Sequence, residues 1–223
     1  MSNSTPRAIL FDLDGTLADT APDLAAAMNL VRTMQGLMPA PYEALRPAAS
    51  AGARGLIGVA YGIGPEDDGY EDLRVAFLDN YASALAVESR LFEGVTELIR
   101  GLSGHGLTWG IVTNKAARFT EPLVLQIGLQ DAGCVISGDT MAHPKPHPAP
   151  LLEAARRLGL TPQDCWYVGD DLRDIQAGQA AGMHTVAAAW GYCGVLAPAS
   201  WGADMVIASP LQLLEQIRSA CSG

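Results

Sequence analysis

Two aspartates, Asp12 and Asp14, follow an apolar run near the start of the chain, in the stretch ILFDLDGTL. Mutual repulsion and partial loss of hydration both disfavour two carboxylates at the end of a buried strand. Alternation along an extended backbone would place both side chains on the same side of that strand. A divalent cation would neutralise them, and oxygen-rich sites suit Mg²⁺. A simple loop with an Asx turn is the alternative interpretation of these residues taken alone.

Three later stretches carry further polar residues, each where a strand is expected to end. In IVTNK, Thr113 and Asn114 offer a hydroxyl and backbone N–H groups that suit a phosphate oxygen. In HPKPHPAP, Lys145 offers a point charge for a phosphoryl group. The stretch YVGDDLRD supplies the acidic residues Asp170, Asp171 and Asp174. In this order, on successive strand ends, these residues favour a site for a metal ion and a phosphoryl group.

Short apolar runs alternate with amphipathic stretches over most of the chain. The runs expected to form strands are Ala8–Phe11, Thr108–Val112, Cys134–Ile136, Cys165–Val168, Thr185–Ala188 and Met205–Ile207. The helices expected between and after them are Val95–Leu102, Ala117–Ile127, Pro150–Leu158, Ile175–Ala181 and Leu211–Ala220. Strands that alternate with helices predict an α/β doubly wound core, in which a parallel sheet is covered on both faces.

The segment from Asp19 to about Arg90 departs from this alternation, because helix follows helix with no strand between them. A capping box at Thr20–Asp23 should start the first helix, which Gly36 should end. Further helices are expected at Ala53–Ala60 and Tyr70–Leu85. The chain is therefore predicted to have a core formed by residues 1–18 and 91–223 and an inserted all-helical cap formed by residues 19–90. The cap would lie over the carboxyl ends of the strands, where open α/β sheets bind ligands.

The formal net charge of −10 argues against nucleic acid and anionic membranes as partners, since both attract basic surfaces. An anionic small-molecule substrate would require positive charge concentrated at the site itself. The four cysteines are widely spaced and the first residues lack the apolar segment of a signal peptide, so we expect a cytoplasmic protein with reduced thiols. The sequence does not define an oligomeric state, and a monomer is the default expectation.

The four motifs resemble those of the haloacid dehalogenase superfamily, in family order and over almost the full length of the chain. The helical insertion is similar to the helical cap of that superfamily. The resemblance implies that Asp12 is a nucleophile that becomes phosphorylated and that Asp14 is the general acid and base. It also implies that Lys145 binds the phosphoryl group with Thr113 and Asn114. The implied Mg²⁺ ligands are Asp12, Asp170 and the backbone carbonyl of Asp14, supported by Asp171 or Asp174.

Other activities of this superfamily fit the sequence less well. Metal-independent dehalogenases and phosphonatases lack the second aspartate, which is present here as Asp14. Phosphonatases also use a cap lysine, whereas residues 19–90 contain no lysine. β-Phosphoglucomutases typically use a histidine and a lysine from the cap region, but the first histidine here is His105. A non-catalytic binding module remains the alternative from a different class.

The expected substrate is a small phosphomonoester that carries a carboxylate. The chain broadly resembles bacterial phosphoglycolate phosphatases, and five stretches resemble N-acetylmuramic acid 6-phosphate phosphatases more closely. These stretches are SAGARGLI, GYEDLRVAFLDNY, LFEGVTELI, WGIVTNKAARFTEPL and VGDDLRDI. In the first stretch, Ser50 and Arg54 are candidates for binding the substrate carboxylate, and Arg118 is a further candidate.

Overall fold

The computed structural model describes residues 5–194 and 196–221 and contains a six-stranded, fully parallel sheet. The strand order across the sheet is β5-β4-β1-β6-β7-β8, so the first strand of the chain lies inside the sheet. The strands are β1 (Ala8–Phe11), β4 (Thr108–Val112), β5 (Val135–Ile136), β6 (Cys165–Gly169), β7 (His184–Ala188) and β8 (Met205–Ile207). The α/β doubly wound fold expected from the sequence is confirmed.

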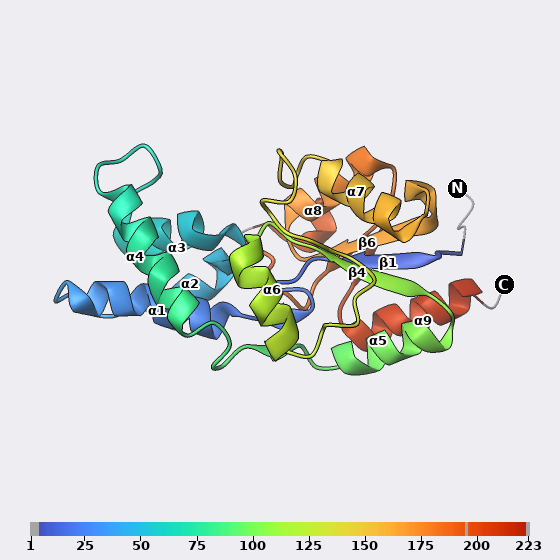
Figure 1. Ribbon diagram of the computed structural model, residues 1–223, viewed down its shortest axis with the longest axis horizontal. Coiled ribbons are helices and arrows are strands. Elements are labelled where there is room, and N and C mark those ends of the chain that lie inside the picture. Colours follow the sequence, from blue (N-terminus) through green and yellow to red (C-terminus); the bar gives the residue numbers. More distant parts are fainter. Residues whose placement is uncertain (1–4, 195, 222–223) are drawn as a thin grey trace.

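Helices cover both faces of this sheet (Figure 1). Ile9 and Phe11 of β1 pack in the cluster that contains α5 (Val95–Gly104), α6 (Ala117–Gln126) and α9 (Pro210–Cys221). Ala8 and Leu10, which alternate with them, pack in the cluster that contains α7 (Ala149–Leu158) and α8 (Leu172–Ala181). Because successive side chains of a strand point to opposite faces, β1 is apolar throughout.

A block of helices lies at one end of the sheet, between the short strands β2 (Ala18–Asp19) and β3 (Arg90–Leu91) (Figure 1). These two strands pair antiparallel, so the chain leaves the core and returns to it at the same place. The elements of the block are α1 (Ala21–Met34), α2 (Tyr42–Leu45), the 3₁₀ helix η1 (Arg46–Ala51), α3 (Gly52–Tyr61) and α4 (Tyr70–Ser83). Two further 3₁₀ helices, η2 (Pro162–Asp164) and η3 (Pro198–Ser200), belong to the core.

The two ends of α1 differ in how well the sequence predicted them. Gly36 adopts a left-handed conformation (φ +75°) just after the helix, as its predicted role as a stop requires. The capping box expected at Thr20 is wrong, because the Thr20 side chain accepts no hydrogen bond from the first turn of α1. The Thr20 hydroxyl instead donates to Asp14, and the backbone N–H groups of Thr20 and Ala21 donate to the hydroxyl of Tyr192.

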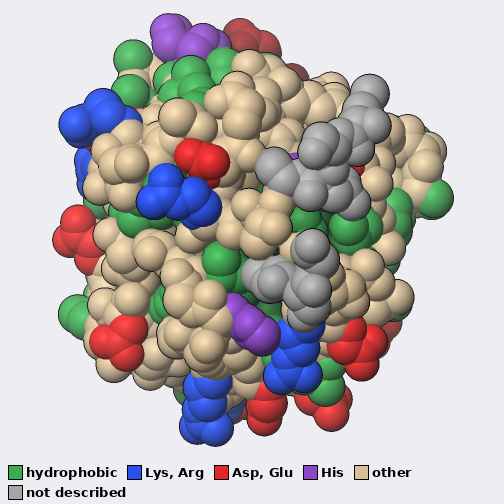
Figure 2. All heavy atoms as spheres, turned by 90° about the vertical axis from the view of Figure 1, so that its right-hand side faces the viewer, with side chains coloured by type: hydrophobic (Ala, Val, Ile, Leu, Met, Phe, Trp, Pro, Cys, Tyr) green, Lys and Arg blue, Asp and Glu red, His purple; other side chains and the backbone are tan. Residues whose placement is uncertain are grey.

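The core end that carries both termini shows positive and negative side chains interspersed with apolar and neutral ones (Figure 2). No helix in the described ranges is both long enough and apolar enough to span a bilayer.

Candidate active site

Three buried carboxylates meet at the carboxyl edge of the sheet. Asp12 follows β1, Asp170 follows β6, and Asp174 lies in the first turn of α8. One oxygen from each lies within 4.8 Å of the others. Burial, together with the neighbouring carboxylates, raises the pKa of Asp12 to about 7 and raises the pKa of Asp170 well above its ordinary value. Ionisation of all three carboxyl groups together therefore requires more positive charge than the protein alone places beside them.

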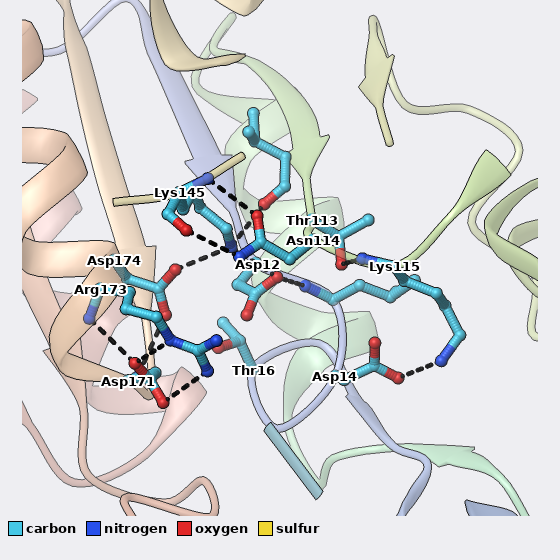
Figure 3. Close-up of polar contacts among 12 residues, drawn as sticks. Asp12, Asp14, Thr16, Thr113, Asn114, Lys115, Lys145, Asp171, Arg173 and Asp174 are labelled. Atoms are coloured by element: carbon cyan, nitrogen blue, oxygen red, sulfur yellow. Dashed lines mark hydrogen bonds and ion pairs between the residues drawn. The ribbon is translucent and has the colours of Figure 1, made fainter. Parts of the chain in front are cut away.

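Lys145 supplies the positive charge nearest to this cluster (Figure 3). Its Nζ lies 2.9 Å from Asp12 Oδ1 and 2.7 Å from Asp174 Oδ1. The same Nζ donates to the carbonyl of Val112 and to the hydroxyl of Tyr167. This one ammonium thus pairs with two of the three carboxylates, and a divalent cation with oxygen ligands would supply the further positive charge. The donor set is suited to Mg²⁺.

Two glycines allow the backbone to approach Asp170 closely. A Cβ atom at Gly15, where φ is +84°, would lie 2.2 Å from Asp170 Oδ2. A Cβ atom at Gly191 would lie 2.2 Å from the carbonyl oxygen of Gly15 and 2.3 Å from Asp170 Cβ. Asp170 also accepts hydrogen bonds from the Thr16 hydroxyl and the Tyr192 backbone N–H. The loops after β1 and β7 therefore fix the position of this carboxylate.

The carboxylate of Asp14 lies in different surroundings from that of Asp12. Its Oδ1 accepts hydrogen bonds from Lys115 Nζ (2.9 Å) and from the Thr20 hydroxyl. Its side chain is not part of the acidic cluster, which is compatible with the expectation that only its backbone carbonyl faces the metal. Burial would lower the pKa of Lys115, but the Asp14 carboxylate and Tyr81 outweigh it and raise that pKa above its ordinary value.

Lys115 lies within the IVTNK motif, but its role was not predicted from the sequence. Its side chain is 7% exposed, and its Nζ lies 4.7 Å from the centre of the Tyr81 ring on α4. The rarity of lysine could have identified it, since the sequence contains only two lysines, Lys115 and Lys145, and both lie in the motifs. Both lysines pair with aspartates of the first motif.

The residues after β4 occupy two different positions. Thr113 is buried, and its hydroxyl oxygen accepts a hydrogen bond from the Lys115 backbone N–H. The side-chain amide of Asn114 donates to the carbonyl of Lys145 and accepts from its backbone N–H, both at 2.9 Å. The Asn114 side chain therefore holds the Lys145 loop in place, which leaves its backbone as the group available to a phosphate.

The block of helices between β2 and β3, called the cap from here on, contacts this edge of the sheet through Ser50. The Ser50 hydroxyl donates to Asp170 Oδ2 at 3.1 Å, and its carbonyl accepts a hydrogen bond from Arg173. Arg173 also forms a two-point contact with Asp171, the N-cap residue of α8. Arg173 is a second residue whose role was not predicted from the sequence. Arg54, by contrast, is exposed on α3 and does not line the cavity described next.

A cavity of about 300 Å³ lies between the helical block and the sheet edge. Its lining includes the site residues Asp12, Asp14, Thr113, Asn114, Lys145, Asp171 and Asp174. Its positively charged lining residues are Arg74, Lys115, Arg118, Lys145 and Arg173. Positive charge is therefore concentrated at the site of an otherwise acidic chain, as an anionic substrate would require.

The sequence matches the haloacid dehalogenase-like hydrolase family over residues 9–188. Because this match spans most of the chain and the motif residues converge in space, the chain belongs to that family. The solved structure of a predicted phosphoglycolate phosphatase from Haemophilus somnus superimposes with a TM-score of 0.83 at 27% identity, over 97% of this chain and 99% of that chain.

Two similar sequences carry different names. An N-acetylmuramic acid 6-phosphate phosphatase from Pseudomonas putida is 43% identical, over 97% of this chain and 98% of the relative. A phosphoglycolate phosphatase from Xanthomonas campestris pv. campestris is 45% identical, over 94% of this chain and 96% of the relative. Sequence identity alone therefore does not distinguish between the activities that these two names describe.

Proposed function

We propose that this chain, a phosphatase of the haloacid dehalogenase-like hydrolase family, hydrolyses small phosphomonoesters through a phosphorylated Asp12. The observation that carries the proposal is the convergence of Asp12, Asp170 and Lys145 at one sheet edge, with Asp14 held separately by Lys115. Two nearby carboxylates in different surroundings can take different roles in acid–base and covalent catalysis.

In the first proposed step, a carboxylate oxygen of Asp12 attacks phosphorus and the bond from phosphorus to the ester oxygen breaks. Asp14 donates a proton to that oxygen, which leaves as an alcohol. In the second step, Asp14 removes a proton from water as the water oxygen attacks phosphorus. The bond between Asp12 and phosphorus then breaks, which releases inorganic phosphate, regenerates the Asp12 carboxylate and leaves Asp14 protonated as at the start of the cycle.

The contacts of Asp12 support its role as the nucleophile. Its Oδ1 accepts a hydrogen bond from the Leu13 backbone N–H at 2.8 Å and lies 2.9 Å from Lys145 Nζ. Both contacts fix the orientation of the carboxylate, and Oδ2 forms no hydrogen bond with the described residues. Thr113 and Lys145 are proposed to bind the phosphoryl oxygens, together with the Asn114 backbone.

We propose Mg²⁺ as the cofactor, held by Asp12, Asp170 and the backbone carbonyl of Asp14. Asp174 lies in the same cluster and would support the ion, whereas Asp171 is held by Arg173 and would act through the position of α8. When bound, Mg²⁺ supplies positive charge that offsets charge on the transferring phosphoryl group.

For the substrate, we propose N-acetylmuramic acid 6-phosphate, as in peptidoglycan recycling, with 2-phosphoglycolate as the alternative. The names of two similar proteins support these candidates, and the mixed cationic and apolar cavity lining supports a carboxylated sugar phosphate. Phosphate release from both compounds with Mg²⁺ should give a clearly higher kcat/KM for the sugar phosphate. A preference for 2-phosphoglycolate would reverse the choice of substrate without affecting the chemistry.

Asp12→Asn tests the chemistry itself. The variant keeps the size of the side chain but removes the nucleophile, so we expect turnover of a generic aryl phosphate to fall by at least about 10³-fold. Intact-protein mass spectrometry after rapid quenching should detect a phosphorylated wild-type chain but no phosphorylated variant. Undiminished turnover by Asp12→Asn would refute the mechanism.

A further inference from the structure

We infer that Arg118 binds the carboxylate of the substrate and thereby selects a carboxylated sugar phosphate. This inference rests on the proposed phosphatase function and adds the residue and the chemistry of recognition. Arg118 is the second residue of α6, which starts shortly after the loop that carries Thr113 and Lys115. It lines the same cavity as those residues.

Arg118 differs from the other positively charged residues of the cavity because they all form ion pairs. Of the four other positively charged lining residues, Lys145 pairs with Asp12 and Asp174, and Lys115 pairs with Asp14. Arg173 pairs with Asp171. The fourth, Arg74, pairs with Glu71. Within residues 5–194 and 196–221, Arg118 forms no ion pair, and its recorded contact is with the Phe119 ring, 4.5 Å from the guanidinium carbon. A cation without a carboxylate partner can bind an anionic ligand group without first breaking an ion pair.

The position of Arg118 separates it from the phosphoryl site. It also lines an adjoining hollow of about 280 Å³, which is bordered by residues 82–87 and by Pro122 and Gln126. Phe119 is likewise shared by both hollows. Arg118 therefore lies on the wall between the cavity and a second hollow that no residue of the acidic cluster lines. A ligand whose carboxylate is remote from its phosphate would place that carboxylate toward Arg118.

The apolar lining indicates the kind of skeleton that connects the two anionic groups. Phe77, Leu78 and Tyr81 of α4 line the cavity from the cap, and Phe119 lines it from the core. A sugar ring with methyl-bearing substituents offers apolar surface to such side chains. In 2-phosphoglycolate, a single methylene group separates the carboxylate from the ester oxygen, so this compound has little to place against them. The structure therefore favours a phosphomonoester of an acidic amino sugar.

The lining of the two hollows also argues against Arg54 as the residue that binds the carboxylate. Both arginines are exposed, but Arg54 on α3 contributes to neither hollow, whereas Arg118 contributes to both. Arg118 and Arg54 were both candidates from the sequence, and the structure places only Arg118 on the cavity wall. A comparison of matched variants of these two arginines is therefore informative.

The test uses two sugar phosphates that differ only in the lactyl ether that carries the carboxylate. N-acetylmuramic acid 6-phosphate carries a lactyl ether with a carboxylate, and N-acetylglucosamine 6-phosphate has a hydroxyl in its place. Wild type, Arg118→Gln, Arg118→Lys, Arg54→Gln and, as a remote control, Arg100→Gln are compared by kcat/KM on both. We expect Arg118→Gln to lose about 10- to 100-fold on the carboxylated substrate and less than about 3-fold on the neutral one. Arg118→Lys should recover part of the loss, because it keeps the charge.

The outcomes separate this inference from the proposed function. Equal losses by Arg118→Gln on both substrates, or a carboxylate-specific loss only in Arg54→Gln, would overturn the role of Arg118 while hydrolysis itself stands. Equal wild-type kcat/KM on the two sugars would overturn it as well. Absence of hydrolysis of every phosphomonoester tested, including an aryl phosphate with Mg²⁺, would refute the proposed function. Thermal unfolding of Arg118→Gln and its aryl phosphate turnover verify that the variant is folded.

Discussion

Asp12 and Asp14 show how two carboxylates two residues apart acquire different properties. Asp12 faces other buried carboxylates and a lysine, and its pKa is raised to about 7. The Asp14 carboxylate instead accepts hydrogen bonds from Lys115 Nζ and from the Thr20 hydroxyl. General-acid action by Asp14 requires a proton on that carboxylate. We therefore assign Lys115, which donates to Asp14, the role of positioning that carboxylate for general-acid action.

Replacement of Lys115 tests this assignment. Lys115→Gln removes the cation from a buried ion pair, so we expect the free energy of unfolding to fall by about 3 kcal/mol. We also expect kcat to fall by at least about 10-fold, with a shift in the pH dependence of kcat, because Asp14 loses the charge that positions it. The measurements are chemical denaturation and a pH–rate profile. Arg156→Gln, which breaks an exposed ion pair on α7, is the control. A wild-type pH profile for Lys115→Gln would contradict the assignment.

A glycine replacement tests the site without changing any charge. Gly191→Ala would place a Cβ atom against Gly15 and Asp170, so one of these loops must shift. Because misplacement by about 1 Å can cost about 10²-fold in rate, we expect a loss of that order together with weaker Mg²⁺ binding. Gly104→Ala is the matched control, since no atom lies within 4 Å of the added carbon. Equal kcat and Mg²⁺ affinity in the two variants would show that the close approach is unimportant.

At the scale of elements, the sequence predicts the strands better than the junctions. The β1 and β4 boundaries agree with prediction because both strands are almost entirely buried and therefore apolar. Helix α8 begins at Leu172, three residues before the predicted Ile175, because Asp171 caps it. The pairing of strands β2 and β3 was not predicted, since two-residue strands carry no periodic signal. Site residues were predicted where a motif alone indicates their role. The roles of Lys115 and Arg173 were not predicted, because they depend on contacts with Asp14 and Ser50, which are distant in sequence.

Asp23 connects the two segments that join the cap to the core. It lies in the first turn of α1 and accepts hydrogen bonds from the backbone N–H groups of Glu88 and Ser89 and from the Ser89 hydroxyl. The outgoing and returning segments are therefore bonded to each other beyond the β2–β3 pair. This contact restricts the orientations that the cap can adopt relative to the sheet.

Asp23→Ala should loosen this junction. It leaves buried donors without acceptors, so we expect a loss of stability of about 1–3 kcal/mol. The amides of Glu88 and Ser89 should exchange hydrogen faster, and KM should rise because the cap is less well oriented. Asp79→Ala, an exposed change on α4, is the control for the loss of a cap carboxylate. Unchanged exchange at Glu88 and Ser89 would exclude Asp23 as the connecting residue.

At the scale of the whole molecule, charge is distributed unevenly. The chain has a formal net charge of −10, yet its only two lysines lie at the site with side chains 7% and 2% exposed. The exposed basic residues are therefore arginines and histidines. Burial of both lysines beside aspartates concentrates positive charge where a phosphate would bind. It also leaves the acidic cluster with an excess of acidic groups, because one lysine lies beside three carboxyl groups.

This excess determines how the whole molecule should respond to Mg²⁺. At 100 times its dissociation constant, an ion that binds only the folded state adds about 2.7 kcal/mol, which for a chain of this size raises Tm by about 5–10 °C. Asp170→Asn removes one of the three buried carboxylates and its repulsion of Asp12. We therefore expect the variant without metal to unfold at or above the Tm of the wild type without metal. Its response to Mg²⁺ should fall below about 2 °C. Thermal unfolding with Mg²⁺ and with a chelator measures both effects. The charge argument fails if the variant without metal is the less stable of the two and still responds fully to Mg²⁺.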